Sequence, residues 1–165
     1  NMWVTDFLWF SCLTMLPLTI FQVCTNLINL ITGFRCSYIR CEFHREKDTF
    51  RNTAGPSGHQ AVALRVSSDH SVFDSCSFEG YQDTLYALAN RQFYTSCIIS
   101  GTVDFIFGNA IAIFQNCELL ARQPNDGQQN TYTAQGRKLA ADVSGFSFQN
   151  CTVGTEAGGG TAPTF

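Results

Sequence analysis

Two acidic residues, Asp83 and Asp104, stand in mainly apolar and aromatic stretches, the segments 81–86 and 101–109. A carboxylate in such a setting loses hydration, and hydrogen bonds or a neighbouring charge must compensate for the loss. Polypeptides keep acids of this kind for hydrogen bonding, metal binding or catalysis. The spacing of the surrounding residues helps to distinguish these uses.

The two acids follow similar residues at the same distance. Cys76 lies seven residues before Asp83, and Cys97 lies seven residues before Asp104. Thr53 lies seven residues before Gln60. If these segments occupy neighbouring coils of a stacked structure, equivalent positions lie about 4.8 Å apart, which is the spacing between paired strands. We therefore expect Gln60, Asp83 and Asp104 to form a column, with Gln82 beside Asp83.

Two carboxylates at that separation do not ionise independently. The pKa of one should rise, so that a single site holds both an acid and a base. The amides of Gln60 and Gln82 can donate hydrogen bonds to a developing oxyanion. This chemistry suits acyl transfer on an ester. Spacing alone also allows a purely structural ladder, in which the polar side chains satisfy buried backbone groups.

The elements that would position these residues repeat along the chain. Segments 50–53, 114–117 and 148–151 share Phe-x-Asn followed by a small residue, and 74–76 and 95–97 are looser copies. The anchor positions are 53, 76, 97, 117 and 151, in steps of 23, 21, 20 and 34. Short β-rich runs, including expected strands at 59–66 and 72–78, alternate with turns. An imperfect period near twenty without amphipathic helices predicts an all-β parallel β-helix.

Composition limits the classes of protein. A chain of 165 residues is expected to form one domain, and 10 Lys and Arg against 13 Asp and Glu argue against nucleic-acid binding. Residues 7–34 carry no charge and are long enough to span a bilayer, although Pro17 and several polar residues interrupt them. Two interpretations of this run therefore remain open: a membrane or signal anchor, and a misassigned segment. Cys36, Cys41 and His44 lack the spacing of a metal site.

Five motifs in order make the chain resemble plant pectin methylesterases. They are Gly55-Pro56-x-x-His59-Gln60-Ala61-Val62-Ala63-Leu64-Arg65, Tyr81-Gln82-Asp83-Thr84-Leu85-Tyr86, Arg91-Gln92-Phe93-Tyr94, Gly101-Thr102-Val103-Asp104-Phe105-Ile106-Phe107-Gly108-Asn109-Ala110 and Thr133-Ala134-Gln135-Gly136-Arg137. The resemblance covers roughly residues 48–165 and none of 1–47. It implies a right-handed parallel β-helix that hydrolyses the methyl esters of polygalacturonate and releases methanol.

The resemblance also implies roles for individual residues. Asp104 would be the nucleophile, and Asp83 the acid that protonates departing methanol and then the base that activates water. Gln60 and Gln82 would form the oxyanion hole. Tyr86 and Phe105, with Gln60, are expected to bind the sugar chain, and Phe107 lies close by. The family implies no metal or organic cofactor, pectin as substrate, a proteinaceous inhibitor as partner, a monomer, and secretion to the cell wall.

The chain also departs from the family pattern. Family members carry a Leu-Gly-Arg-Pro-Trp segment beyond the point where this sequence ends, and their early coils precede the residue that corresponds to Thr49. We therefore expect a β-helix that is incomplete at both ends, with 1–47 an atypical segment and 48–165 a partial pectinesterase domain. A fragment, or a gene model that reads through non-coding sequence, would explain the pattern.

Cysteines at equivalent anchors lie within disulfide reach if the coils stack as expected. The expected pairs are Cys117 with Cys151 and Cys76 with Cys97, and the alternative is a ladder of buried thiols. Two other functions remain open: a different pectin-active β-helix enzyme, and a catalytically incomplete remnant that binds pectin. A lyase would need calcium-binding acids, and a galacturonidase an acid pair that holds water. Neither pattern is present in the sequence.

Overall fold

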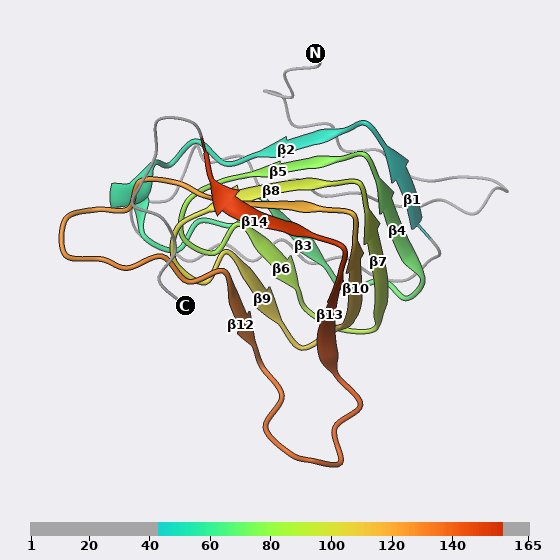
Figure 1. Cartoon of the computed structure of the whole chain (residues 1–165). Helices are drawn as coiled ribbons and strands as arrows, with labels where there is room; N and C mark the ends of the chain where they lie inside the picture. The colour runs from blue at the N-terminus through green and yellow to red at the C-terminus, as the bar shows by residue number, and fades with distance from the viewer. Residues whose placement is uncertain (1–42, 157–165) are drawn as a thin grey trace, which may run out of the picture.

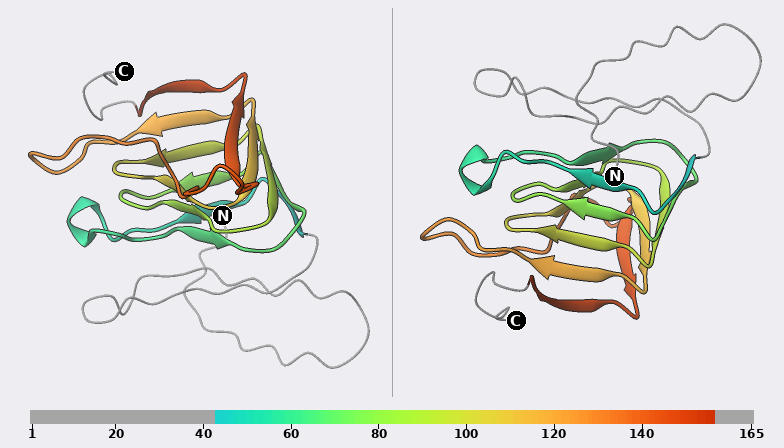
Figure 2. Two further views of the ribbon diagram at one scale, coloured as in Figure 1. Left: turned by 90° about the horizontal axis from the view of Figure 1, so that it is seen from below. Right: turned by 90° about the horizontal axis from the view of Figure 1, so that it is seen from above.

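Three parallel β-sheets surround one core in residues 43–156, the part of the chain that this computed structural model describes (Figure 1). The chain visits the three sheets in turn and then begins the next coil, so that the coils stack in chain order (Figure 2). The uncharged run at 7–34, Cys36 and Cys41 lie outside the described residues. Within residues 43–156, no helix is long and apolar enough to cross a membrane.

Each sheet collects the equivalent strands of successive coils. Sheet A contains β1 (Phe43–Glu46), β4 (Ser71–Asp74), β7 (Arg91–Thr95), β10 (Ile111–Gln115) and β13 (Gly145–Gln149). Sheet B contains β2 (Thr49–Arg51), β5 (Ser77–Glu79), β8 (Ile98–Gly101), β11 (Glu118–Ala121) and β14 (Thr152–Thr155). Sheet C contains β3 (Leu64–Val66), β6 (Leu85–Ala87), β9 (Ile106–Gly108) and β12 (Thr133–Gln135). A single 3-10 turn, η1 (Pro56–Gly58), accompanies them.

This arrangement confirms the predicted all-β, right-handed parallel β-helix. Parallel strands joined by crossover connections are right-handed in nearly all proteins. Strand β1 pairs with β4, so the stack already includes residue 43 and begins before residue 48, where the sequence suggested the start of the domain.

Aromatic side chains of sheet A stack through the core. The rings of Phe73 and Tyr94 lie 5.0 Å apart, those of Tyr94 and Phe114 4.7 Å, and those of Phe114 and Phe148 4.7 Å. Each pair is formed by residues in direct register on neighbouring strands. Aromatic pairs of this kind stabilise a fold by about 0.5–1.5 kcal/mol each beyond the area that they bury.

One residue in the left-handed region makes each corner between sheets A and B. These corner residues have φ values between 51° and 56° and are Lys47, Ser75, Ser96, Asn116 and Asn150. The expectation of one strand over residues 72–78 is therefore wrong. Its alternating pattern is real, but the chain turns at Ser75, and the pattern belongs to β4 and β5 on two different sheets.

The corner also corrects the first anchor of the repeat. The amide of Ser77 donates to the carbonyl of Asp48 at 2.8 Å, just as the amide of Ile98 donates to Cys76 at 2.9 Å. Asp48, not Thr53, is thus equivalent to Cys76. Phe50 pairs with Phe78 on sheet B, so the segment 50–53 lies one strand later in its coil than the Phe-x-Asn segments that it resembles.

The four described cysteines are free thiols, so neither expected disulfide is formed in this structure. They do occupy equivalent positions: the amide of Glu118 donates to Cys97 and that of Thr152 to Cys117. The thiols of Cys97, Cys117 and Cys151 each contact the carbonyl of a residue in the preceding coil, at 3.4–3.6 Å. The alternative of a thiol ladder therefore describes the structure.

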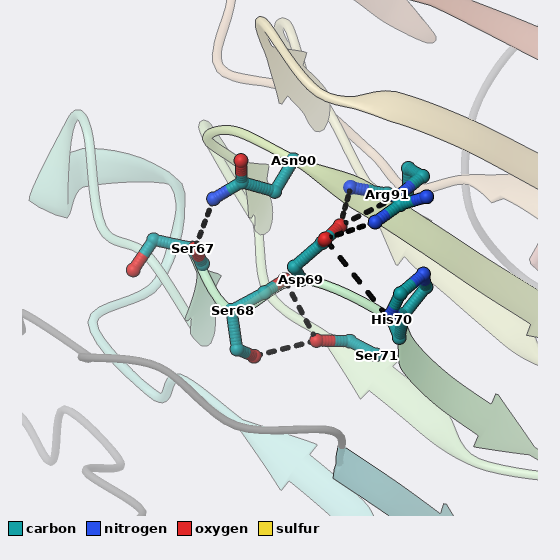
Figure 3. A network of polar contacts seen from close by, with 7 residues as sticks. All are labelled: Ser67, Ser68, Asp69, His70, Ser71, Asn90 and Arg91. Carbon is teal, nitrogen blue, oxygen red and sulfur yellow. Dashed lines mark hydrogen bonds and ion pairs between the residues drawn. The ribbon is translucent and has the colours of Figure 1, made fainter.

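A polar cluster ties two coils together at the corner between sheets C and A (Figure 3). The Asp69 carboxylate accepts hydrogen bonds from the Arg91 backbone amide at 3.0 Å and from its Nε at 2.9 Å. These contacts hold the pKa of Asp69 below its usual value. The hydroxyls of Ser68 and Ser71 hydrogen-bond to each other at 2.5 Å beneath them. The cluster follows the end of β3, whereas Asp83 and Asp104 precede β6 and β9.

Candidate active site

The connections between sheets B and C differ in length, and the shortest two carry the acids. Segment 80–84 joins β5 to β6 and contains Asp83, and segment 102–105 joins β8 to β9 and contains Asp104. The connections on either side, 52–63 and 122–132, are much longer and extend beyond the coil stack (Figure 2). The Asn125 side-chain amide donates to the Pro56 carbonyl at 3.0 Å and joins these two long connections.

Asp83 and Asp104 occupy equivalent positions in neighbouring coils. Leu85 pairs with Ile106, and the amide of Asp83 donates to the carbonyl of Val103 at 3.0 Å. Both acids have left-handed backbone conformations, with φ of 63° and 50°. Asp tolerates this region better than most residues because its short polar side chain can form local hydrogen bonds. The column of acids expected from the spacing is therefore present.

The surroundings of Asp83 raise the pKa of its carboxyl group. Asp83 is 7% exposed. Burial, followed by the negative charge of Asp104, raises the pKa of Asp83 from 3.8 to about 6. A carboxyl group that keeps its proton in weakly acidic solution can donate it, and the neighbouring carboxylate can act as a base or nucleophile.

The two glutamines flank this pair, but in a different register from the one expected. The amide of Ala61 donates to the carbonyl of Gln82 at 3.1 Å. The peptide between Gln60 and Ala61 thus faces the peptide between Gln82 and Asp83, so Gln60 is equivalent to Gln82 and not to Asp83. The register changes by one residue between Ala61 and β3, where the amides of Ala63 and Leu64 both donate to the Thr84 carbonyl, at 2.8 Å and 3.3 Å. Gln60 is exposed and Gln82 is half-buried.

Sequence reasoning did not identify Thr84 as part of the site. Its side chain is completely buried, and its hydroxyl lies 3.2 Å from the Tyr81 carbonyl and 3.0 Å from the Ser100 carbonyl. The Tyr81 carbonyl also accepts a hydrogen bond from the Thr102 amide at 2.9 Å. These bonds fix the turn that carries Gln82 and Asp83 against the next coil. A buried hydroxyl next to an acid in a short turn is the signal that could have identified it.

Aromatic residues near the acids divide between the surface and the core. Tyr86 and Phe107 are half-exposed on sheet C, and their rings stack at 4.3 Å with Arg65 5.5 Å above the Tyr86 ring. Phe105 is completely buried and packs on Tyr132 at 5.1 Å. The expectation that Phe105 contacts a sugar is therefore wrong, because Phe105 lies in the connection just before β9 and belongs to the core. Phe107 is the exposed member of that segment.

Comparison with known proteins supplies a family. A family model described as Pectinesterase matches residues 21–163. Pectinesterase/pectinesterase inhibitor 3 of Arabidopsis thaliana is 58% identical over 106 residues, which are 64% of this chain and 18% of that protein. The chain therefore spans less than a fifth of the length of this relative.

Solved structures of pectin methylesterases also superpose on this chain. Pectin methylesterase from carrot superposes with a TM-score of 0.69 and 50% identity, over 70% of this chain and 36% of the carrot chain. A pectin methylesterase in complex with a hexasaccharide superposes with a TM-score of 0.60 and 32% identity, over 69% of this chain and 40% of that chain.

Proposed function

Because the chain belongs to the pectinesterase family, we propose that it is a carboxylic ester hydrolase that demethylates methyl-esterified homogalacturonan to pectate and methanol. The observation that carries this proposal is the pairing of Asp83 with Asp104 in neighbouring coils, with the pKa of Asp83 raised to about 6. An ester hydrolase of this type needs one carboxylate as nucleophile and one carboxylic acid as proton donor, and this pair supplies both.

In the first half of the proposed reaction, a carboxylate oxygen of Asp104 attacks the carbonyl carbon of the methyl ester. The carbonyl electron pair moves to oxygen, where side-chain amides of Gln60 and Gln82 donate hydrogen bonds to it. The intermediate collapses, the bond to the methoxy oxygen breaks, and that oxygen takes the proton from Asp83. Methanol leaves, and the galacturonate acyl group remains joined to Asp104 as an anhydride.

In the second half, the Asp83 carboxylate takes a proton from water as the water oxygen attacks the acyl carbon. The bond to the Asp104 oxygen breaks, releasing the galacturonate carboxylic acid and regenerating the Asp104 carboxylate. Asp83 ends protonated, ready for the next ester. Burial of Asp83 supports its role as the group that alternates between acid and base, because it reduces the cost of holding a proton.

The exposed rings of Tyr86 and Phe107 are proposed to contact the sugar chain, since aromatic faces pack well against sugar rings. One related structure is a pectin methylesterase in complex with a hexasaccharide, which supports a polysaccharide substrate. Pectin as substrate places the enzyme in the cell wall. The name of one relative includes a pectinesterase inhibitor, which supports a proteinaceous inhibitor as a further partner.

The test is methanol release from highly methyl-esterified pectin by the full chain, measured beside Asp104→Asn and Asp83→Asn. We expect release by the unaltered chain and loss of at least about 100-fold in each variant. Asp142→Asn is the matched control, because Asp142 is partly exposed in the connection between β12 and β13 and its replacement should leave the rate unchanged. Pectin binding without methanol release by folded protein would contradict the hydrolase and favour the binding function.

A further inference from the structure

We propose that Arg122 is a positioning residue for this reaction: it clamps the Gly80–Tyr81 backbone and thereby holds Gln82 and Asp83 in place. The inference rests on the proposed function and adds a residue that touches none of the reacting groups. Arg122 directly follows β11, two coils beyond the turn that it contacts.

Three contacts define the clamp. The Arg122 guanidinium donates from one Nη to the Gly80 carbonyl at 3.0 Å and lies 4.6 Å above the ring of Tyr81. Its Nε donates to the Glu156 carboxylate at 2.7 Å, beyond the end of β14. A planar guanidinium can stack on a ring and donate in its own plane at once, whereas a lysine ammonium cannot do both. The Arg122 side chain is one-fifth exposed, whereas that of Glu156 is 40% exposed.

The side chain of Arg122 reaches past the coil that contains β8 to the turn two coils away. The Arg122 backbone amide donates to the Gly101 carbonyl at 2.7 Å. A Cβ added to Gly101 would lie 2.3 Å from the Cβ of Phe105 and 2.7 Å from the Tyr81 carbonyl oxygen. Gly101 pairs with Ala121, so Arg122 is in register with Thr102 of the intervening coil.

The clamp holds the side of the turn that other contacts leave open. The Tyr81 carbonyl is held by the Thr84 hydroxyl of the same turn at 3.2 Å and by the Thr102 amide of the next coil at 2.9 Å. Arg122 secures the Gly80 carbonyl and the Tyr81 ring. Gln82 follows Tyr81 directly, so a displacement of Tyr81 changes the direction of the Gln82 amide and the depth of Asp83. Displacements of about 1 Å at a reacting group can cost about 100-fold in rate.

The kinetic test compares Arg122→Lys and Arg122→Met with the unaltered chain, using methyl-esterified pectin. We expect kcat to fall about 10- to 100-fold in both variants while KM changes less than about 3-fold. Arg51→Met is the matched control, since Arg51 forms an ion pair with Glu79 on the exposed side of sheet B. An unchanged kcat per folded molecule in Arg122→Lys and Arg122→Met would overturn the proposal.

A second measurement tests the clamp without measuring catalysis. Its result therefore does not depend on the proposed function. Hydrogen exchange of the Asp83 and Thr102 amides reports the bonds to Val103 and Tyr81. We expect both amides to exchange faster in Arg122→Lys, with the corner amides of Ile98 and Glu118 unchanged. Unchanged protection at Asp83 and Thr102, or an equal loss at all four amides, would overturn the positioning role. Absence of methanol release by the unaltered chain would contradict only the hydrolase.

Discussion

Burial of Asp83 lowers the folding stability by an amount that depends on pH. Below pH 3.8, the carboxyl is protonated in both folded and unfolded chains, and burial carries little penalty. As the pH rises, the unfolded chain loses the proton first. The folded chain loses it only near pH 6, so folding stability falls across this interval. The raised pKa therefore destabilises the folded protein at neutral pH, as is common where a site stores strain for chemistry.

Asp83→Asn should remove this penalty. The gain in unfolding free energy over the unaltered chain should be larger at pH 8 than at pH 3.5, by up to about 3 kcal/mol. Urea unfolding at both pH values measures the difference. Asp142→Asn provides the contrast, because hydrogen bonds from the backbone amides of Leu139 and Lys138 lower the pKa of Asp142. A gain from Asp83→Asn that is equal at both pH values would contradict the interpretation.

The spacing of single residues predicted the acids because each is one coil from the next. It failed for Gln60 because the count began at Thr53, whereas Asp48 is the residue equivalent to Cys76. It failed for Phe105 because residues 105–107 are all apolar, and the sequence does not show that the connection before β9 turns Phe105 into the core. Arg122 was missed because its partners Gly80 and Glu156 lie 42 and 34 residues away in the sequence.

At the level of the elements, glycine sets how closely consecutive coils approach. Gly108 ends β9 with φ of +126°, and a Cβ there would lie 2.0 Å from the carbonyl oxygen of Ala87 at the end of β6. Its own carbonyl accepts a hydrogen bond from the Gly136 amide at 2.7 Å. The position therefore permits no side chain without movement of a neighbouring strand end.

Gly108→Ala should lower the unfolding free energy by about 2–3 kcal/mol, because both the steric overlap and the backbone conformation disfavour a side chain. Gly145→Ala is the matched control, since no atom lies within 4 Å of the Cβ that it would add. Chemical denaturation of the two variants gives the comparison. Equal stabilities would show that β6 and β9 can separate at little cost.

Repetition of elements made the fold predictable, and irregular corners made its details hard to predict. The Phe-x-Asn and cysteine anchors recur because sheet A and the A–B corner repeat in every coil. The first coil has Lys47 and Asp48 at that corner, residue types that do not resemble Asn116 and Cys117. Without a shared residue type, the sequence offered only the misleading segment 50–53.

For the whole molecule, each coil contacts mainly its neighbours, so stability should be distributed along the stack. Phe114 sits near one end of the aromatic column, between Tyr94 and Phe148, and Phe146 meets it edge to face at 5.8 Å. Loss of this ring removes contacts to the coils on both sides. The damage should be greatest in the coils that contain β10 and β13.

Phe114→Ala should therefore cost about 3–5 kcal/mol. Hydrogen exchange should accelerate more at the Asn116 and Thr152 amides, near β13 and β14, than at the Asn52 amide near β2. Ile113→Ala on the outer face of the same strand, where the residue is 38% exposed, should cost less than about 1 kcal/mol. A uniform acceleration in Phe114→Ala would instead indicate that the stack opens as one cooperative unit.

The reactivity of the thiols in the ladder can report how the coils open in solution. Cys76, Cys97 and Cys117 are buried, whereas Cys151 is partly accessible. In reducing-agent-free buffer, immediately after reduction, a small thiol reagent should label Cys151 first among the four cysteines of residues 43–156. The other three should follow only as their coils part, and mass spectrometry of the labelled peptides can order them. Labelling in the order Cys151, Cys117, Cys97 and Cys76 would show that the coils open one after another from β14 inward. Simultaneous labelling of the last three would show a single opening event.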